Sequence, residues 1–212
     1  MTKERDHHKN EKFYRKAKKE GYRARSAYKL FDIQKMYNIF KRAFYILDIG
    51  CAPGSWLQVI KKFAEKNLGK YNDQYYYRDH FKIMGIDIVN TTPIENIHII
   101  KADVTKPEIQ AELDNFFYSK LDLVVSDASI KKIGNKFTDH IRQLTLCYKI
   151  MDIVKRNLKF NGNLVIKVFQ GSDFNKFYQD IKPLFRILKA YKPQSSKKKS
   201  NEIYLIGLQK KN

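Results

Sequence analysis

Short apolar runs alternate with helical patterns along most of this 212-residue chain, and no other feature limits its possible folds as strongly. The first run, 44–49, closes on Gly50 and has the continuous apolar character of a parallel strand buried on both faces. Strands are predicted at 44–49, 81–88, 98–100, 121–126, 163–169, 185–190 and 203–208. Helices are predicted at 27–37, 55–63, 107–117, 139–158 and 173–181. This alternation predicts an α/β fold, with a central, mostly parallel seven-stranded sheet and helices on both faces.

The length and the apolar content of 43% fit one domain that buries roughly 70% of its unfolded surface. The chain shows no internal repeat and no linker. We therefore expect residues 1–25 to form a basic arm, either mobile or a frayed helix, and residues 26–212 to form a single domain. Ser26 is the predicted N-cap of the first helix in that domain. The polar, tyrosine-rich stretch 66–80 predicts a surface loop insertion away from the chemistry.

The charge of the chain favours a polyanionic partner. Lys and Arg number 42 against 22 Asp and Glu, and the excess lies at the two ends. Residues 1–29 hold 11 basic and 4 acidic side chains, and residues 182–212 hold 9 and 1. Neutralising phosphates with such side chains releases counterions and supplies most non-specific affinity for nucleic acid. The alternative is a solvated, solubilising surface.

The cysteines and the hydropathy pattern indicate the cellular compartment of the protein. Cys51 and Cys147 are too few for a disulfide framework, which favours an intracellular, reducing compartment, either the cytoplasm or an organelle such as the mitochondrion. No apolar run approaches the ~20 residues of a membrane span. The charged N-terminus lacks the apolar segment of a secretory signal. We expect a monomer with no membrane partner.

Acidic residues lie at or just after the ends of four successive predicted strands: Asp48, Asp87, Asp103 and Asp127. The turn 48–54 lies at the carboxyl edge of the sheet, where open α/β folds bind their ligands. It matches neither a dinucleotide fingerprint nor a Walker A loop. Four carboxylates at one edge indicate a ligand rich in hydroxyl and amino groups. Ordinary caps and turns are the alternative.

A lysine interrupts one of the apolar strands. Lys167 lies within 163–169, and a lysine there must either extend its ammonium to water or pair with an acid. Glu202, which precedes the last strand, could reach it. This pattern predicts a functional lysine.

Five separated motifs occur in order from residue 22 to the C-terminus, at 22–30, 48–56, 125–127, 165–171 and 192–204. Together they resemble the FtsJ-type RNA 2′-O-ribose methyltransferases, most of all the branch that acts on ribosomal RNA. The stretches Lys-Val-Phe-Gln-Gly at 167–171 and Lys-Pro-Gln-Ser-Ser at 192–196 are the most specific to that family. The chain departs from the family after Asp127, where Ala-Ser-Ile stands, so the resemblance does not define the loop 128–138.

The resemblance implies a Rossmann-like methyltransferase fold with S-adenosylmethionine as cofactor and no metal ion. It implies a catalytic tetrad of Lys29, Asp127, Lys167 and Glu202. The implied cofactor contacts are Gly50, Ala52, Pro53, Gly54, Ser55, Trp56, Asp87, Asp103 and Asp127. We expect RNA contacts at Arg23, Arg25, Lys192, Lys197, Lys198 and Lys199.

The expected activity is methylation of a ribose 2′-hydroxyl, of a uridine in large-subunit ribosomal RNA or in a pre-ribosomal particle. Lys167 would act either as a neutral base or as a charged group that orients the hydroxyl, and the residues leave both open. One alternative is a transfer RNA anticodon-loop methyltransferase. A catalytically silent RNA-binding protein on the same fold is disfavoured by the intact tetrad. A small-molecule methyltransferase is disfavoured by the net charge of +20.

Overall fold

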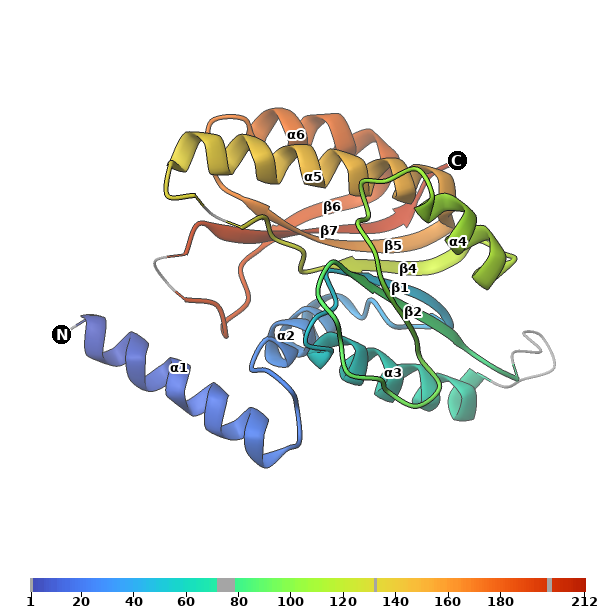
Figure 1. Cartoon of the computed structure of the whole chain (residues 1–212), viewed down its shortest axis with the longest axis horizontal. Coiled ribbons are helices and arrows are strands. Elements are labelled where there is room, and N and C mark those ends of the chain that lie inside the picture. The colour runs from blue at the N-terminus through green and yellow to red at the C-terminus, as the bar shows by residue number, and fades with distance from the viewer. Residues whose placement is uncertain (1, 72–78, 132, 198–199) are drawn as a thin grey trace.

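The computed structural model describes residues 2–71, 79–131, 133–197 and 200–212. A seven-stranded sheet lies at the centre, in the order β3-β2-β1-β4-β5-β7-β6 (Figure 1). Its strands are β1 (Tyr45–Ile49), β2 (Lys82–Asp87), β3 (His98–Lys101), β4 (Leu121–Ser126), β5 (Leu158–Phe169), β6 (Phe185–Tyr191) and β7 (Glu202–Lys210). The pairs that β7 forms with β5 and β6 are antiparallel, and the remaining pairs are parallel. The predicted fold class is therefore confirmed.

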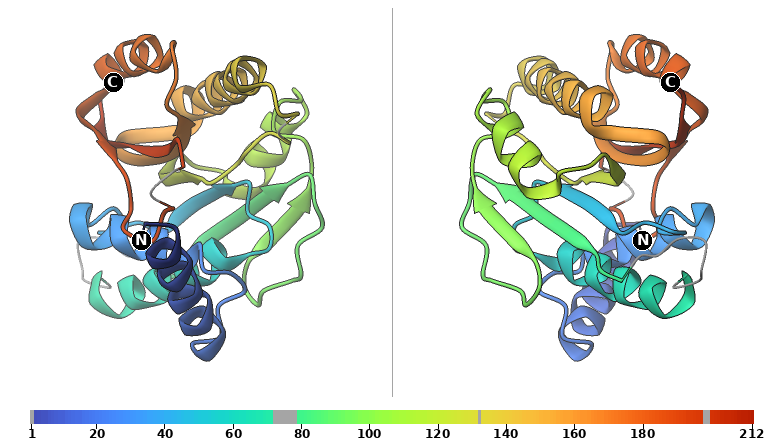
Figure 2. Two further views of the ribbon diagram at one scale, coloured as in Figure 1. Left: turned by 90° about the vertical axis from the view of Figure 1, so that its left-hand side faces the viewer. Right: turned by 90° about the vertical axis from the view of Figure 1, so that its right-hand side faces the viewer.

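Helices cover both faces of this sheet (Figure 2). They are α2 (Ala27–Tyr37), α3 (Ser55–Tyr71), α4 (Ile109–Phe117), α5 (Lys136–Asn157) and α6 (Phe174–Ile181), with a short 3-10 turn η1 (Lys182–Leu184). Alternate side chains of β1 enter two different cores, since successive residues of a strand point to opposite faces. Leu47 and Ile49 pack with α4, α5 and α6, whereas Ile46 packs with α2 and α3. Burial on both faces explains why the central strands are continuously apolar.

The basic arm begins with helix α1 (Thr2–Lys19), which extends away from the sheet (Figure 1). Its last turns contact the domain: Ala17 is buried, and the rings of Phe13 and Tyr28 lie 5.4 Å apart. The ammonium of Lys16 lies 4.7 Å from the centre of the Tyr28 ring. The arm is thus a helix attached at its C-terminal end.

Two local predictions are wrong. Ser26 precedes α2, but its φ of −60° and ψ of −20° are already helical and its side chain makes no capping bond; its Oγ lies 2.8 Å from Ser55 Oγ instead. The loop predicted at 66–80 is helical as far as Tyr71, because the amide of Asn67 donates to two backbone carbonyls of the core and extends α3. The rest of that stretch, 72–78, lies outside the described residues.

The bounds of α5 and β5 also differ from the prediction. Helix α5 begins at Lys136, three residues early, because the side chain of Asn135 caps it by accepting from the Thr138 N–H at 3.0 Å. Strand β5 begins at Leu158, five residues before the predicted start at 163. Cys51 and Cys147 are both buried free thiols. No helix among the described residues has the length and apolar character that crossing a membrane requires.

Candidate functional site

The four residues of the implied tetrad come from four elements and meet at the carboxyl edge of the sheet. Lys29 lies on α2, Asp127 follows β4, Lys167 lies near the end of β5, and Glu202 begins β7. The Nζ of Lys167 lies 3.1 Å from Asp127 Oδ1 and donates to the Asp127 carbonyl at 2.5 Å. The Nζ of Lys29 lies 3.7 Å from Asp127 Oδ1 and 3.5 Å from Glu202 Oε2. The structure therefore assembles two cations and two anions into one network.

Tyr204 belongs to the same network. It pairs with Lys167 across the antiparallel β5–β7 ladder, so the two side chains project to the same face. Its hydroxyl donates to Asp127 Oδ1 at 2.5 Å and accepts from Lys29 Nζ at 3.0 Å. Sequence analysis missed this residue, although its position two places after Glu202 puts both on one face of a strand.

The network determines the protonation of its acidic members. Burial acts to raise the pKa of Asp127, but Lys167, Lys29 and the Tyr204 hydroxyl together hold that pKa below its usual value. Asp127 is therefore ionised at neutral pH. Burial, and then the adjacent Asp127 carboxylate, raise the pKa of Tyr204 well above its usual value, so this phenol stays protonated and acts as a donor. Asp127 is consequently a fixed negative charge between two ammonium groups.

This depressed pKa predicts an acid-dependent stability. A carboxyl group with a lowered folded-state pKa stabilises the fold above its unfolded pKa of ~3.9 and loses that contribution as the pH falls through the folded value. We expect Asp127→Asn to be less stable than wild type at pH 7. The difference should shrink below about pH 4. Urea unfolding of both proteins between pH 7 and pH 3 measures it, and a constant difference over that range would contradict the network.

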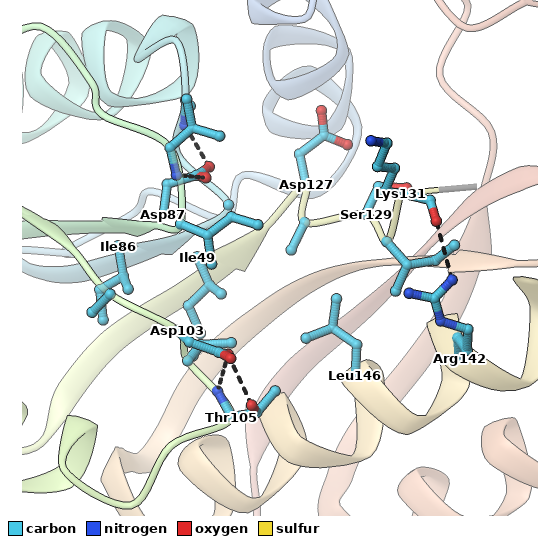
Figure 3. A pocket seen from close by; sticks show the side chains of 18 of the residues that line it. Ile49, Ile86, Asp87, Asp103, Thr105, Asp127, Ser129, Lys131, Arg142 and Leu146 are labelled. Atoms are coloured by element: carbon cyan, nitrogen blue, oxygen red, sulfur yellow. Dashed lines mark hydrogen bonds between the residues drawn. The ribbon is translucent and has the colours of Figure 1, made fainter. Parts of the chain in front are cut away.

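A cavity of about 730 Å³ opens beside the tetrad. Asp87 and Asp103 lie on one side of it, Lys131 and Arg142 lie on the other, and Asp127 lies between them (Figure 3). Its volume falls within the roughly 300–1,000 Å³ of small-molecule and cofactor sites. The cavity joins the tetrad to the acidic strand ends.

The turn after β1 forms one wall of this cavity through Gly50 and Ala52. Gly50 has φ +79°, and a Cβ there would lie 2.4 Å from the Ala128 Cα, so only glycine lets the loops after β1 and β4 pack this closely. Gly54 also has a positive φ of +103°, and the bond between Ala52 and Pro53 is cis. Asp87 holds the turn in place, because its Oδ2 accepts the Ala52 N–H at 2.9 Å.

Ser55 and Trp56 begin α3, and their side chains point toward α2. Ser55 Oγ lies 2.8 Å from Ser26 Oγ, and Trp56 Nε1 donates to the Ser26 carbonyl at 2.9 Å. The Trp56 ring also packs against the Tyr204 ring, with centroids 5.8 Å apart. The N–H groups in the first turn of a helix have no partner within the helix and form a natural anion site. The cavity lining does not include Pro53, Gly54, Ser55 or Trp56, so cofactor contacts at these four residues stay predictions.

The acidic side chains fit a ligand that carries hydroxyl and amino groups. Asp103 Oδ1 accepts from both the N–H and the hydroxyl of Thr105, which lowers the pKa of Asp103 and keeps it charged. Asp48 lies near the end of β1, two residues before Gly50; it is fully buried, and neither of its side-chain oxygens has a hydrogen-bond partner among the described residues. Burial, followed by Asp127 and Asp87, raises the pKa of Asp48 well above its usual value. The cavity lining does not include Asp48 but does include Asp87, Asp103 and Asp127, which can accept hydrogen bonds from the hydroxyl and amino groups of a ligand.

The loop after Asp127 is held by Gln143, a fully buried side chain of α5 that the motifs did not reveal. Its Oε1 accepts from the Ile130 N–H at 3.1 Å, and its Nε2 donates to the Ala128 carbonyl at 3.1 Å. Asp139 holds the next part of the loop by accepting from the backbone N–H of Ile133. Helix α5 thereby sets the conformation of the loop that the resemblance left undefined.

Several residues expected to bind RNA make contacts within the protein. Arg23 donates to the carbonyls of Pro53 at 3.0 Å, Thr92 at 2.6 Å and Pro93 at 2.9 Å, and so ties the cofactor turn to the loop after β2. Lys192 closes its own loop by donating to the Ser200 carbonyl at 2.6 Å. RNA contact at both residues, and at Arg25 and Lys197, stays a prediction. Lys198 and Lys199 lie outside the described residues.

The family model of FtsJ-like methyltransferases matches residues 22–210. The chain belongs to the FtsJ-like methyltransferase family. A relative from Archaeoglobus fulgidus, named Ribosomal RNA large subunit methyltransferase E, is 37% identical over 195 residues, which cover 92% of this chain and 93% of the relative. A crystal structure described as a ribosomal RNA methyltransferase from Plasmodium falciparum is 30% identical, with a TM-score of 0.75 over 89% of this chain and 98% of that one.

More distant structures share the fold alone. A Burkholderia thailandensis N1-methyltransferase, crystallised with S-adenosylhomocysteine, has a TM-score of 0.54 at 9% identity, over 88% of this chain and 79% of that one. The predicted family, the methyltransferase fold and a methyltransferase activity are thereby confirmed. The predicted methyl donor, S-adenosylmethionine, accords with this FtsJ-like family and with the shared fold.

Proposed function

We propose that this FtsJ-like methyltransferase transfers a methyl group from S-adenosylmethionine to a ribose 2′-hydroxyl, of a uridine in large-subunit ribosomal RNA. The observation that carries the proposal is the network of Lys29, Asp127, Lys167, Glu202 and Tyr204 at the edge of a cofactor-sized cavity. The names of the relatives support ribosomal RNA as the substrate. The net charge of +20 supports a polyanionic one.

The residues that would hold the cofactor line the acidic side of the cavity. Asp87 and Asp103, which line the cavity, would accept hydrogen bonds from ribose hydroxyls and the adenine amine, and the turn at Gly50 and Ala52 would take the amino-acid end. When bound, S-adenosylmethionine supplies a methyl group already activated by its sulfonium. The protein therefore has to align the hydroxyl and manage its proton.

Lys167 is the residue that would contact the 2′-hydroxyl. Its side chain is only 6% exposed, and its Nζ is fixed by the Asp127 carboxylate and by the Asp127 carbonyl. A lysine held in this way either accepts the hydroxyl proton or aligns the oxygen lone pair as a charged donor. Lys29 balances the charge of Asp127 from the other side, and Glu202 balances Lys29. The monomeric state, the reducing compartment and the division at residue 25 stay predictions.

The identity of the substrate is tested by mapping the methylated nucleotide in the RNA. Purified protein is incubated with methyl-labelled S-adenosylmethionine and with large-subunit ribosomal RNA or transfer RNA from cells that lack the enzyme. We expect label at one uridine of the ribosomal RNA and protection of the following phosphodiester from alkaline cleavage. A 2′-deoxy nucleotide at that position should take no label. Label confined to a transfer RNA anticodon loop would mean that transfer RNA is the substrate. Absence of label from both RNAs would contradict the proposed activity.

The placement of the cofactor predicts the effect of Asp103→Ala. Losing a hydrogen bond to a charged carboxylate costs about 1.5–3 kcal/mol, so the dissociation constant for S-adenosylhomocysteine should rise about 10- to 150-fold. Titration calorimetry measures this value. Asp152→Ala, which removes an exposed carboxylate of α5, is the charge-matched control and should bind like wild type. Equal affinities for the two variants would mean that the cofactor does not reach Asp103.

A further inference from the structure

We propose that Ser195 is a positioning residue, which acts through Asp32 to hold Lys29 in the catalytic network. This inference rests on the proposed function, because it assigns a role in the same reaction. Ser195 belongs to the Lys-Pro-Gln-Ser-Ser segment, residues 192–196, which follows β6. The lining of the cofactor cavity does not include this segment, so a role in the reaction has to act through other residues.

Lys29 differs from the rest of the tetrad in the element that carries it. The other three residues lie at or near the ends of strands, whose backbone is fixed by the sheet, whereas Lys29 lies on α2. The apolar side of this helix, with Leu30 and Ile33, packs in the core. Apolar packing is non-directional, so it does not by itself fix the far end of a lysine side chain. Polar contacts of α2 have to supply that precision.

Asp32 supplies such a contact one turn after Lys29. Residues three apart are neighbours on the surface of a helix. The Oδ2 of Asp32 accepts from the N–H of Ser195 at 3.2 Å and from its hydroxyl at 3.3 Å. Ser195 is only 5% exposed. Two donors on one carboxylate oxygen form charge-assisted bonds, which fix the turn of α2 from which Lys29 projects.

A ring contact holds the end of the same helix. Tyr37 is the last residue of α2 and Tyr191 is the last residue of β6. Their ring centroids lie 5.4 Å apart at an interplanar angle of 82°. Edge-to-face packing is a favoured arrangement of two aromatic rings. Helix α2 is therefore attached both to the end of β6 and to the segment after it, and two attachment points restrict its rotation.

The connection from β6 to β7 also contacts the partner of Lys29. The Nζ of Lys192 donates to the Ser200 carbonyl at 2.6 Å, and the Ser200 Oγ accepts from the Glu202 N–H at 3.2 Å. The Oε2 of Glu202 lies 3.5 Å from Lys29 Nζ. The described part of this connection thus bonds to the helix that carries the lysine and to the residue that carries its carboxylate partner.

The position of Lys29 leaves little tolerance for movement. Its Nζ lies 3.7 Å from Asp127 Oδ1, close to the limit of about 4 Å for an ion pair. A misplacement of about 1 Å can reduce an enzymatic rate by about 10². Ser195→Ala removes the hydroxyl but leaves the N–H on Asp32, so we expect a smaller loss, of about tenfold.

Ser195→Ala tests this contact without changing any charge. Methylation of large-subunit ribosomal RNA is measured at saturating S-adenosylmethionine, and the affinity for S-adenosylhomocysteine is measured by calorimetry. We expect kcat to fall about tenfold while the KM for RNA and the cofactor affinity stay at the wild-type values. Ser119→Ala removes an exposed serine between α4 and β4, at the opposite edge of the sheet. This matched control should keep wild-type kinetics.

A double-mutant cycle shows whether the effect passes through Lys29. In a Lys29→Ala background, Ser195→Ala should cause no further fall in kcat, because the group that it positions is gone. Urea unfolding of the same four proteins gives a second cycle that needs no RNA. Ser195→Ala should lower the unfolding midpoint less in that background than in wild type, whereas independent effects would add. If Ser195→Ala does not fold, Asp32→Asn enters the same cycles.

Three results would overturn the inference. The first is a wild-type kcat in Ser195→Ala. The second is a raised KM for RNA with an unchanged kcat, which would make Ser195 part of an RNA contact. The third is additive losses in both cycles, which would make its bond to Asp32 a contribution to stability alone. Failure of the proposed function would look different, since the wild type itself would then methylate no RNA, and the urea cycle would still test the coupling to Lys29.

Discussion

Lys167→Ala is expected to abolish methyl transfer while cofactor affinity stays near the wild-type value. Its ammonium is the only nitrogen of the described network that touches both the carboxylate and the carbonyl of Asp127. Losing a positioned acid–base group costs about 10²–10⁴ in rate, and a misaligned hydroxyl adds to that loss. Single-turnover methylation of the RNA measures the rate. Lys189→Ala removes an exposed lysine of β6 and should retain wild-type turnover. Near-normal turnover in Lys167→Ala would remove Lys167 from the mechanism.

Lys167→Arg distinguishes the two roles of the lysine. Arginine keeps the positive charge but cannot lose its proton in a protein. A variant that keeps more than about a tenth of the activity would leave only an orienting role, because loss of a general base costs about 10²–10⁴. The pH dependence adds a second readout. If neutral Lys167 is required, the single-turnover rate rises with pH and then levels off, whereas a flat profile indicates a charged, orienting lysine.

Asp127→Asn is expected to have the second largest effect, on both activity and stability. The substitution keeps the shape of the side chain but leaves the nearly buried Lys167 ammonium without its carboxylate. Removing one partner of a buried ion pair destabilises a protein by about 3–5 kcal/mol. Urea unfolding at pH 7 should show a loss of this order. Methyl transfer should fall by about 10² or more, because the lysine loses its fixed position.

Tyr204→Phe is the control that separates charge from hydrogen bonding in this network. It removes the hydroxyl between Lys29 and Asp127 and leaves every charge in place. Both hydrogen bonds of this hydroxyl are to charged groups, and one such bond contributes about 1.5–3 kcal/mol. Because Lys29 and Asp127 keep each other as ion-pair partners, the loss of stability should stay below that of Asp127→Asn. Equal losses in the two variants would mean that the charge of Asp127 contributes nothing beyond its hydrogen bond to Tyr204.

The fold class and the location of the chemistry both follow from local patterns in the amino-acid sequence. Strands that are continuously apolar and separated by helices have to form a parallel sheet covered on both faces, since each helix must bury one side. Acidic residues at the ends of parallel strands then collect at one edge, which brought Asp87, Asp103 and Asp127 together without any tertiary information. The motifs placed the four tetrad residues, because their order along the chain is specific to one family.

Packing between distant segments sets which side chains complete the site and which stabilise the fold. Tyr204 joins the network because the antiparallel register places it opposite Lys167, and register depends on pairing between distant segments. Ser26 faces Ser55 instead of capping its own helix, and Arg23 ties two loops together. The ion pair of Lys29 with Glu202 joins segments more than 170 positions apart. Local patterns predict strands and helices because those depend on near neighbours, whereas the direction of a side chain and its partners are set by packing between remote parts of the chain.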